Sequence, residues 1–163
     1  MKKGVIFDMD GLLIDSEKIW QKNWKILAKE FGYEPAPEFS KKICGTSGQH
    51  MLDVITTYYP GVDPVEFRRI ERERVKRDIY EGVDLKPGVV KLLSFLKEKG
   101  IPMAVASSSA MALIEHNLTS CGIKEFFDAV VSSEAVTNGK PAPDIFLLAA
   151  EKLGIPQVTY CID

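Results

Sequence analysis

Hydrophobic residues along the chain follow two different periods. Some segments have apolar residues every three or four positions, which is typical of amphipathic helices. Other segments are short, continuous apolar runs, and after the first run helical segments lie between them. Because strands that alternate with helices are typical of a parallel sheet covered on both faces, we expect an α/β, Rossmann-like core from residues 1–14 and 84–163. The apolar runs, which are typical of buried strands, occupy residues 5–7, 101–106, 126–131 and 158–162.

An all-helical block interrupts this alternation directly after the first strand. Its first helix has one apolar face and ends at Gly32, and further helical patterns continue to about residue 81. Residues 67–80 interleave basic with acidic side chains, which indicates a solvated helix face more than a site for anions. We therefore expect residues 15–83 to form a helical cap domain. The apolar face of its first helix consists of Trp20, Trp24, Leu27, Ala28 and Phe31.

Polar residues stand where the predicted strands end. Asp8 and Asp10 close the first strand, Ser107 begins a run of three serines after the second, and Asp163 follows the last. The carboxyl ends of parallel strands meet at one edge of a sheet, so we expect these residues to lie together, with Lys140 supplied by a loop. Asp10 could instead belong to an ordinary turn.

These residue types together predict phosphoryl transfer. Carboxylates gathered in one place repel each other unless a cation lies among them, and oxygen ligands favour Mg²⁺. A hydroxyl group, backbone N–H groups and a lysine suit a phosphate. Taken alone, Ser107 could instead cap the next helix, and Lys140 could be a solvated loop lysine.

The composition is that of an ordinary globular protein. The chain has 163 residues, of which 45% are apolar, and a net charge of −2, so we expect neither a nucleic-acid nor a membrane partner. The first apolar run is too short for a signal peptide. Three cysteines without a CxxC pair indicate reduced thiols in a cytoplasmic protein. We expect a monomer that binds a small phosphorylated metabolite, either a sugar phosphate or a nucleotide-like compound.

Four motifs occur in a fixed order along the whole chain: DMDGLLIDS at residues 8–16, VASSS at 105–109, GKPAPDIF at 139–146 and YCID at 160–163. This order resembles the haloacid dehalogenase superfamily, in its phosphatase and β-phosphoglucomutase-like branch with a helical (C1-type) cap. The first motif is highly specific. Each of the other motifs alone is weak evidence for this family, but the four motifs in this order are strong evidence for it.

The resemblance implies the catalytic residues. Asp8 would attack phosphorus and form an aspartyl-phosphate, which divides one difficult displacement into two easier ones. Asp10 would protonate the leaving oxygen and then deprotonate the attacking water. Lys140 would neutralise charge on the nucleophile and on the phosphoryl group.

The resemblance also implies the ligand-binding residues. The Ser107 hydroxyl and the Ser108 N–H would hold the phosphoryl group together with Gly11. Mg²⁺ would lie between the Asp8 carboxylate, the Asp10 carbonyl and Asp163.

The sequence departs from this family at two places. Members carry a second acid directly after the position of Asp163, followed by further core elements, so we expect this chain to be a fragment that lacks them. β-Phosphoglucomutases have a histidine where this chain has Trp20, and a cap arginine follows a Gly-x-Ser that corresponds here to residues 45–47. Both differences favour a phosphatase.

Three other functions remain as alternatives. A hexose-phosphate mutase and an inactive truncated fragment stay open, whereas Asp10 counts against a carbon–halogen hydrolase. The substrate depends on cap side chains that close over it. We expect Thr46, Ser47 and Gln49, which lie at a break rich in small residues, to contribute to this selection.

Overall fold

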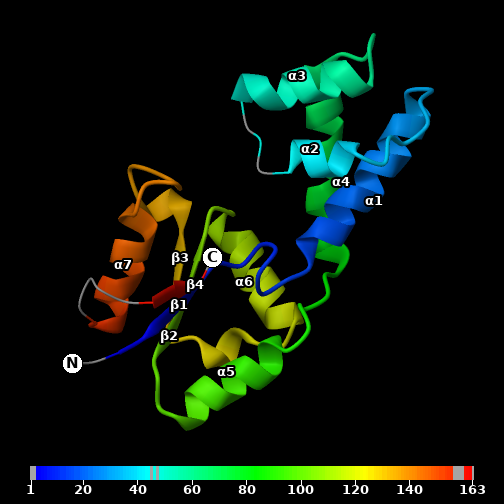
Figure 1. Ribbon diagram of the computed structural model, residues 1–163. Coiled ribbons are helices and arrows are strands. Elements are labelled where there is room, and N and C mark those ends of the chain that lie inside the picture. The colour runs from blue at the N-terminus through cyan, green and yellow to red at the C-terminus, as the bar shows by residue number, and fades with distance from the viewer. Residues whose placement is uncertain (1–2, 45, 47, 156–159, 163) are drawn as a thin grey trace. The chain divides into compact units, whose positions relative to one another are not determined.

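The computed structural model describes residues 3–44, 46, 48–155 and 160–162. The chain folds into two compact units (Figure 1). Residues Met1–Ser16 and Gly82–Asp163 form the core unit, which contains the sheet. Residues Glu17–Glu81 form the cap unit, which is helical.

The core unit is built on a four-stranded parallel sheet in the order β3-β2-β1-β4. The first strand is central, and its Phe7 pairs with Val105 on one side and Ile162 on the other. The expected α/β fold is therefore confirmed. The strands are β1 (Val5–Phe7), β2 (Met103–Ser107), β3 (Ala129–Ser132) and β4 (Tyr160–Ile162).

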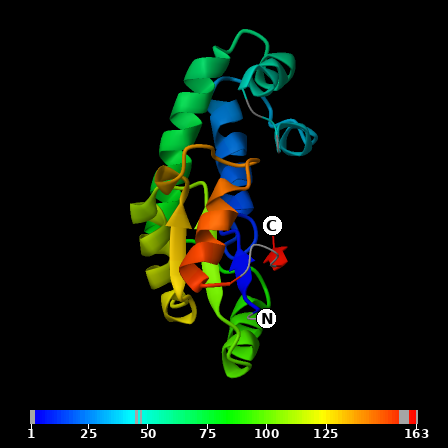
Figure 2. The same ribbon diagram turned by 90° about the vertical axis from the view of Figure 1, so that its left-hand side faces the viewer.

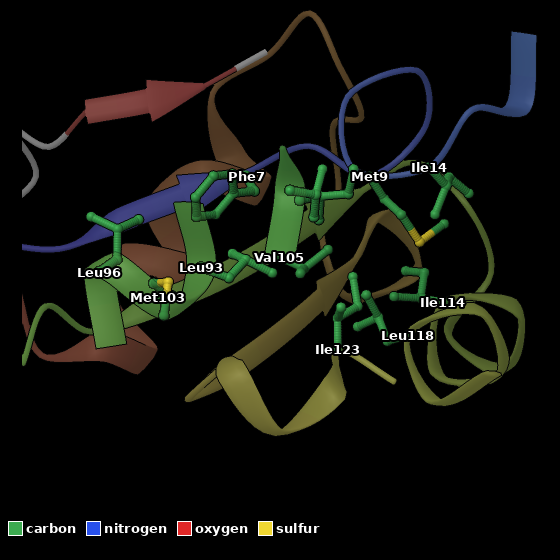
Figure 3. Packing of buried hydrophobic residues seen from close by; sticks show 12 residues of the cluster. Phe7, Met9, Ile14, Leu93, Leu96, Met103, Val105, Ile114, Leu118 and Ile123 are labelled. Carbon is green, nitrogen blue, oxygen red and sulfur yellow. The ribbon is translucent and has the colours of Figure 1, made fainter. Parts of the chain in front are cut away.

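Helices cover both faces of this sheet (Figures 1 and 2). Because successive strand residues point to opposite faces, Phe7 packs with α5 (Val89–Glu98) and α6 (Met111–Ser120). Its neighbour Ile6 packs instead with α7 (Asp144–Leu153). Figure 3 shows the first cluster, in which Leu93 and Leu118 meet Val105 of β2. Both faces of the central strands are thus buried.

The third strand begins later than the sequence pattern predicts. A short 3-10 helix, η1 (Lys124–Phe126), occupies the start of the predicted strand, and Phe126 N–H donates to Ile123 O to close it. Asp128 then accepts a hydrogen bond from Met103 N–H through its carboxylate at 2.9 Å. The first residues of the apolar run 126–131 therefore belong to a turn, and the strand begins only at Ala129. A second 3-10 helix, η2 (Ser133–Ala135), follows β3 directly.

The two segments that join the core unit to the cap sequence are paired with each other. Asp15 N–H donates to Asp84 O at 2.8 Å, and Lys86 N–H donates to Leu13 O at 2.9 Å. An ion pair of 2.9 Å between Lys86 Nζ and Asp15 Oδ1 joins the same segments. Both segments are therefore held next to the end of β1.

The cap unit consists of helices around an aromatic core. The buried rings of Trp24, Phe39, Tyr59 and Phe67 form its centre. Ion pairs line the exposed face of the last helix, as between Arg69 and Glu66. Among the residues that the structure describes, no helix is long and apolar enough to cross a membrane. The helices are α1 (Ser16–Glu30), α2 (Phe39–Ile43), α3 (Gly48–Tyr58) and α4 (Pro64–Glu81).

Candidate active site

Asp8 and Lys140 form an ion pair beside the carboxyl end of β1. Lys140 Nζ lies 2.9 Å from Asp8 Oδ1, and the same oxygen accepts a hydrogen bond from Met9 N–H at 2.8 Å. Both contacts hold the Asp8 carboxylate through the same oxygen, Oδ1.

Asp10 is held by two serine hydroxyls. Ser109 Oγ donates to Asp10 Oδ2 at 3.0 Å, and Ser107 Oγ donates to the same oxygen at 3.3 Å. Burial raises the pKa of Asp10, and the charge of Asp8 acts in the same direction. The two hydroxyls and Lys140 oppose this effect on the pKa. Asp10 therefore holds a proton more tightly than an exposed aspartate, as suits a general acid.

Ser107 is the last residue of β2 and is fully buried. Its Oγ accepts a hydrogen bond from Ser109 N–H at 3.1 Å, which turns the chain back toward Asp10. Ser107 does not cap α6, because Met111 N–H at the start of that helix donates to Glu134 Oε2 at 3.0 Å. The hydroxyl of Ser107 thus faces the site and not the helix.

The loop that carries Lys140 is fixed at both ends. Asn138 donates to Asp144 Oδ2 through its backbone N–H at 3.3 Å and through Nδ2 at 3.0 Å. On the other side, the ammonium of Lys140 lies 4.8 Å from the ring centroid of Phe146. The Lys140 side chain is only 19% exposed, in contrast to an ordinary solvated loop lysine.

Sequence reasoning missed three residues that position this site. Ser109 stands in a serine run, but only the turn after β2 shows that its hydroxyl reaches Asp10. Glu134 supplies an acceptor from the segment after β3, and no local pattern signals this contact. Asp144 could have been found from the sequence. It is an acid in the first turn of a helix, and it follows the asparagine of an Asn-Gly pair by six residues. This spacing suggests a hydrogen bond across the loop.

The remaining predicted phosphate ligands lie beside the same strand ends. Gly11 adopts a positive φ of 78°, and its N–H donates to Ile14 O at 3.0 Å within the turn that follows β1. Ser108 is exposed, and its carbonyl accepts a hydrogen bond from Ser133 Oγ. Their roles in phosphate binding stay predictions.

The donor set at this edge suits a hard divalent cation. Asp8 and Asp10 supply oxygen ligands alone, and the charge of Asp8 raises the pKa of Asp10, a repulsion that a cation between them would relieve. Within residues 3–44, 46, 48–155 and 160–162, no three acidic, histidine or cysteine side chains gather as a metal site. Asp163, the third ligand that the resemblance implies, lies outside the described residues.

The predicted specificity residues belong to the cap unit. Thr46 is half-buried beside a cavity of that unit, and its Oγ1 donates to Ile43 O at 2.7 Å. Gln49 is exposed on α3 and donates to Asp53 Oδ1 at 2.9 Å, one turn along the helix. Ser47 lies outside the part of the chain that the structure describes. A role in specificity stays a prediction for all three.

Comparison with known proteins shows which family this chain resembles. A sequence model of the haloacid dehalogenase-like hydrolases matches residues 5–161. The phosphorylated carbohydrates phosphatase of Thermotoga maritima is 31% identical over 154 residues, which cover 94% of this chain and 71% of that protein. The fructose-1-phosphate phosphatase YqaB of Escherichia coli K12 is 32% identical over 160 residues, which cover 98% of this chain and 84% of that protein.

A solved structure extends the likeness to three dimensions. The crystal structure of a HAD family hydrolase from Deinococcus radiodurans R1, with bound phosphate and sodium, matches this chain with a TM-score of 0.78 and 27% identity. The match covers 94% of this chain and 68% of that one. Since the family's sequence model spans nearly the whole chain and the fold agrees, this chain belongs to the haloacid dehalogenase-like hydrolases.

Proposed function

We propose that this chain carries the active site of a Mg²⁺-dependent phosphatase that hydrolyses a small phosphorylated carbohydrate. The observation that carries the proposal is the pairing of Asp8 with Lys140 next to an Asp10 that two serine hydroxyls hold. One carboxylate is thereby positioned as a nucleophile, and the other has a pKa raised by burial, as a general acid requires.

The first step transfers the phosphoryl group to Asp8. Its Oδ2 forms a bond to phosphorus while the bond from phosphorus to the ester oxygen breaks, and Asp10 gives its proton to that leaving oxygen. Lys140 stabilises the negative charge that spreads over the phosphoryl oxygens. The Ser107 hydroxyl and the Ser108 N–H hold two of these oxygens.

The second step releases phosphate. Asp10 is now ionised and takes a proton from water, whose oxygen attacks phosphorus while the bond to Asp8 breaks. Orthophosphate leaves, and Asp8 returns as a carboxylate with Asp10 protonated. Asp8 thus acts as the nucleophile, and Asp10 acts as the acid in the first step and as the base in the second.

A bound Mg²⁺ would supply further positive charge for the transferring phosphoryl group. Asp8, the Asp10 carbonyl and Asp163 are the groups that we expect to hold it. Removal of divalent ions with EDTA should therefore abolish activity, and Mg²⁺ should restore it. Full activity in EDTA would contradict this part of the proposal.

The substrate class rests on the relatives. One of them is named for phosphorylated carbohydrates and another for fructose 1-phosphate, and both match more than nine-tenths of this chain. A phosphorylated sugar or sugar alcohol is accordingly the class that we propose.

Phosphate release tests the proposal directly. The protein should release phosphate from p-nitrophenyl phosphate and from members of a panel of sugar and polyol phosphates, and Asp8→Asn should abolish release. The panel also tests the mutase alternative, because a mutase would convert β-glucose 1-phosphate to glucose 6-phosphate with little free phosphate. No release from any compound would contradict a phosphatase.

A further inference from the structure

The ammonium of Lys140 is held inside the core unit. Its Nζ is buried, and the side chain as a whole is 19% exposed. An ion taken out of water costs free energy unless charges or dipoles of the protein replace the water around it. The Asp8 carboxylate, 2.9 Å from Nζ, supplies one such charge. Because an ammonium carries three N–H groups, one carboxylate cannot replace its whole hydration shell.

Phe146 presents the face of its ring to the same ammonium. Lys140 Nζ lies over this ring, 4.8 Å from the centroid, within the limit of about 6 Å for a cation–π contact. The face of an aromatic ring is negative, so it attracts a cation, and the attraction grows where water is excluded. By comparison, Lys99 lies 5.6 Å from the ring centroid of Phe95, which is exposed. The contact of Lys140 is therefore both closer and better shielded from water.

The ring of Phe146 is carried by a helix that the sheet holds in place. Phe146 lies in the first turn of α7, and its N–H donates to Pro143 O at 3.0 Å. The flanking Ile145 and Ala149 are fully buried with residues of β1 and β2, and Phe146 packs against the same cluster. Lys140, in contrast, belongs to a loop. The helix thus offers a fixed surface to a side chain whose own segment is neither helix nor strand.

A purely space-filling role for Phe146 would have a different signature. Leucine could then replace it with some loss of stability and no specific effect on Lys140, because both side chains are apolar. The contact with the buried ammonium points to the aromatic face instead, since only a ring presents a negative electrostatic potential to a cation.

We propose that Phe146 is a positioning residue for Lys140, and that the face of its ring holds the buried ammonium beside Asp8. The inference rests on the proposed function, because the phosphoryl transfer proposed there gives Lys140 its task. In this role Phe146 acts only through the lysine and takes no part in bond making. The sequence pattern did not reveal the role, because Phe146 lies in the apolar run 145–150, which is typical of a buried helix.

Nuclear magnetic resonance can test the contact without turnover. Protons close to the face of an aromatic ring resonate upfield, so the ε-methylene protons of Lys140 should be shifted upfield in protein labelled with ¹³C-lysine. Lys140→Met identifies the signal by its loss. Phe146→Leu should return the signal to the range of exposed lysines, whereas Phe146→Tyr should keep it upfield. An unshifted Lys140 signal in the wild type would overturn the proposal.

Kinetics tests the consequence for catalysis. Phe146→Leu should lower kcat for p-nitrophenyl phosphate about tenfold, which lies within the range for loss of a cation–π contact shielded from water. Phe146→Tyr keeps the ring and should retain most of the wild-type kcat. Phe95→Leu is the matched control, because it removes the exposed ring beside Lys99 in α5, and it should leave kcat unchanged.

A double-mutant cycle separates positioning from general packing. In the Lys140→Met background, Phe146→Leu should cause no further loss of kcat, because no ammonium is left to hold. An equal loss in both backgrounds would mean that Phe146 supports the site by packing alone, and would overturn the proposal. If Phe146→Leu does not fold, Phe146→Met takes its place, because its flexible apolar side chain fills similar space without a ring.

The two measurements also keep this inference apart from the proposed function. A Lys140 signal that is upfield and depends on the Phe146 ring, in a protein that releases no phosphate from any compound of the panel, would uphold the contact and contradict only the proposed function. Release of phosphate with wild-type kcat in a folded Phe146→Leu protein would overturn only the positioning role.

Discussion

Lys140 Nζ lies 2.9 Å from Asp8 Oδ1, although the whole helical cap and two strands separate these residues in the sequence. The lysine is held by its loop and by the ring of Phe146, so its charge is in place before a substrate arrives. Such preorganised charge lowers the barrier because the protein need not reorganise during the reaction.

Replacement of Lys140 by methionine should therefore reduce kcat for p-nitrophenyl phosphate by about 10²–10³-fold. Lys152→Met, at an exposed position in α7, is the control and should retain wild-type kcat. Circular dichroism of both variants checks that they fold. A folded Lys140→Met protein with wild-type kcat would remove this lysine from the proposed mechanism.

Ser109→Ala should move the pH dependence of catalysis upward. The Ser109 hydroxyl donates to ionised Asp10 and thereby lowers its pKa, so its loss raises that pKa further. Asp10 then stays protonated to higher pH, and the alkaline limb of kcat/KM for a sugar phosphate, with its poor leaving group, shifts to higher pH. Ser120→Ala removes a hydroxyl at the end of α6 and should leave the profile unchanged. A downward shift for Ser109→Ala would contradict the assignment of Asp10 as the acid.

Asp10→Asn should stabilise the fold at neutral pH while it abolishes activity. Burial raises the native pKa of Asp10 above its ordinary value of 3.8, so the native state binds this proton more tightly than the unfolded chain. The contribution of Asp10 to the free energy of unfolding is then complete below pH 3.8 and is lost as pH rises through the native pKa.

Calorimetry in EDTA can measure this effect. Asparagine does not ionise, so the variant does not lose stability as pH rises. Asp10→Asn should therefore melt at a higher temperature than the wild type at pH 7 and at a similar temperature in acid. Asp84→Asn replaces an exposed carboxylate of the core unit and should show no such difference. A lower melting temperature for Asp10→Asn at pH 7 would mean that ionised Asp10 stabilises the fold.

The parallel sheet and the polar residues at the ends of its strands could be predicted from the sequence. Asp8, Asp10 and Ser107 each follow an apolar run, and parallel strands must end at one edge, so their proximity follows from topology. Lys140 lies in a loop, and its place beside Asp8 was predicted through the family resemblance.

Contacts that depend on turns and tertiary packing were not predictable. The hydroxyl of Ser109 reaches Asp10 only because the chain turns back through Ser107 Oγ. Likewise Arg68 and Glu71 belong to a stretch whose interleaved charges predict solvent exposure, yet Glu71 is fully buried and Trp24 Nε1 donates to it. Periodicity assigns a face to a helix but does not show which charged residue the neighbouring helix covers.

Buried Glu71 should make the stability of the cap depend on pH. Burial raises its pKa from 4.5 to about 7, although the charge of Arg68 opposes this. The native cap therefore binds the Glu71 proton more tightly than the unfolded chain does. Its contribution to stability is complete below pH 4.5 and is lost as pH rises to about 7, a change of about 3 kcal/mol.

Glu71→Gln should remove this pH dependence, because glutamine does not titrate while it keeps an oxygen for the Trp24 indole N–H. Urea unfolding followed by tryptophan fluorescence reports on the cap, since Trp20 and Trp24 both belong to it. We expect the wild-type midpoint to fall between pH 4.5 and 7 and the midpoint of Glu71→Gln to change much less over this range. Glu73→Gln alters an exposed carboxylate on the same helix and should behave as the wild type. If Glu71→Gln kept the wild-type slope, Glu71 would be ionised throughout this range, and its pairing with Arg68 would outweigh its burial.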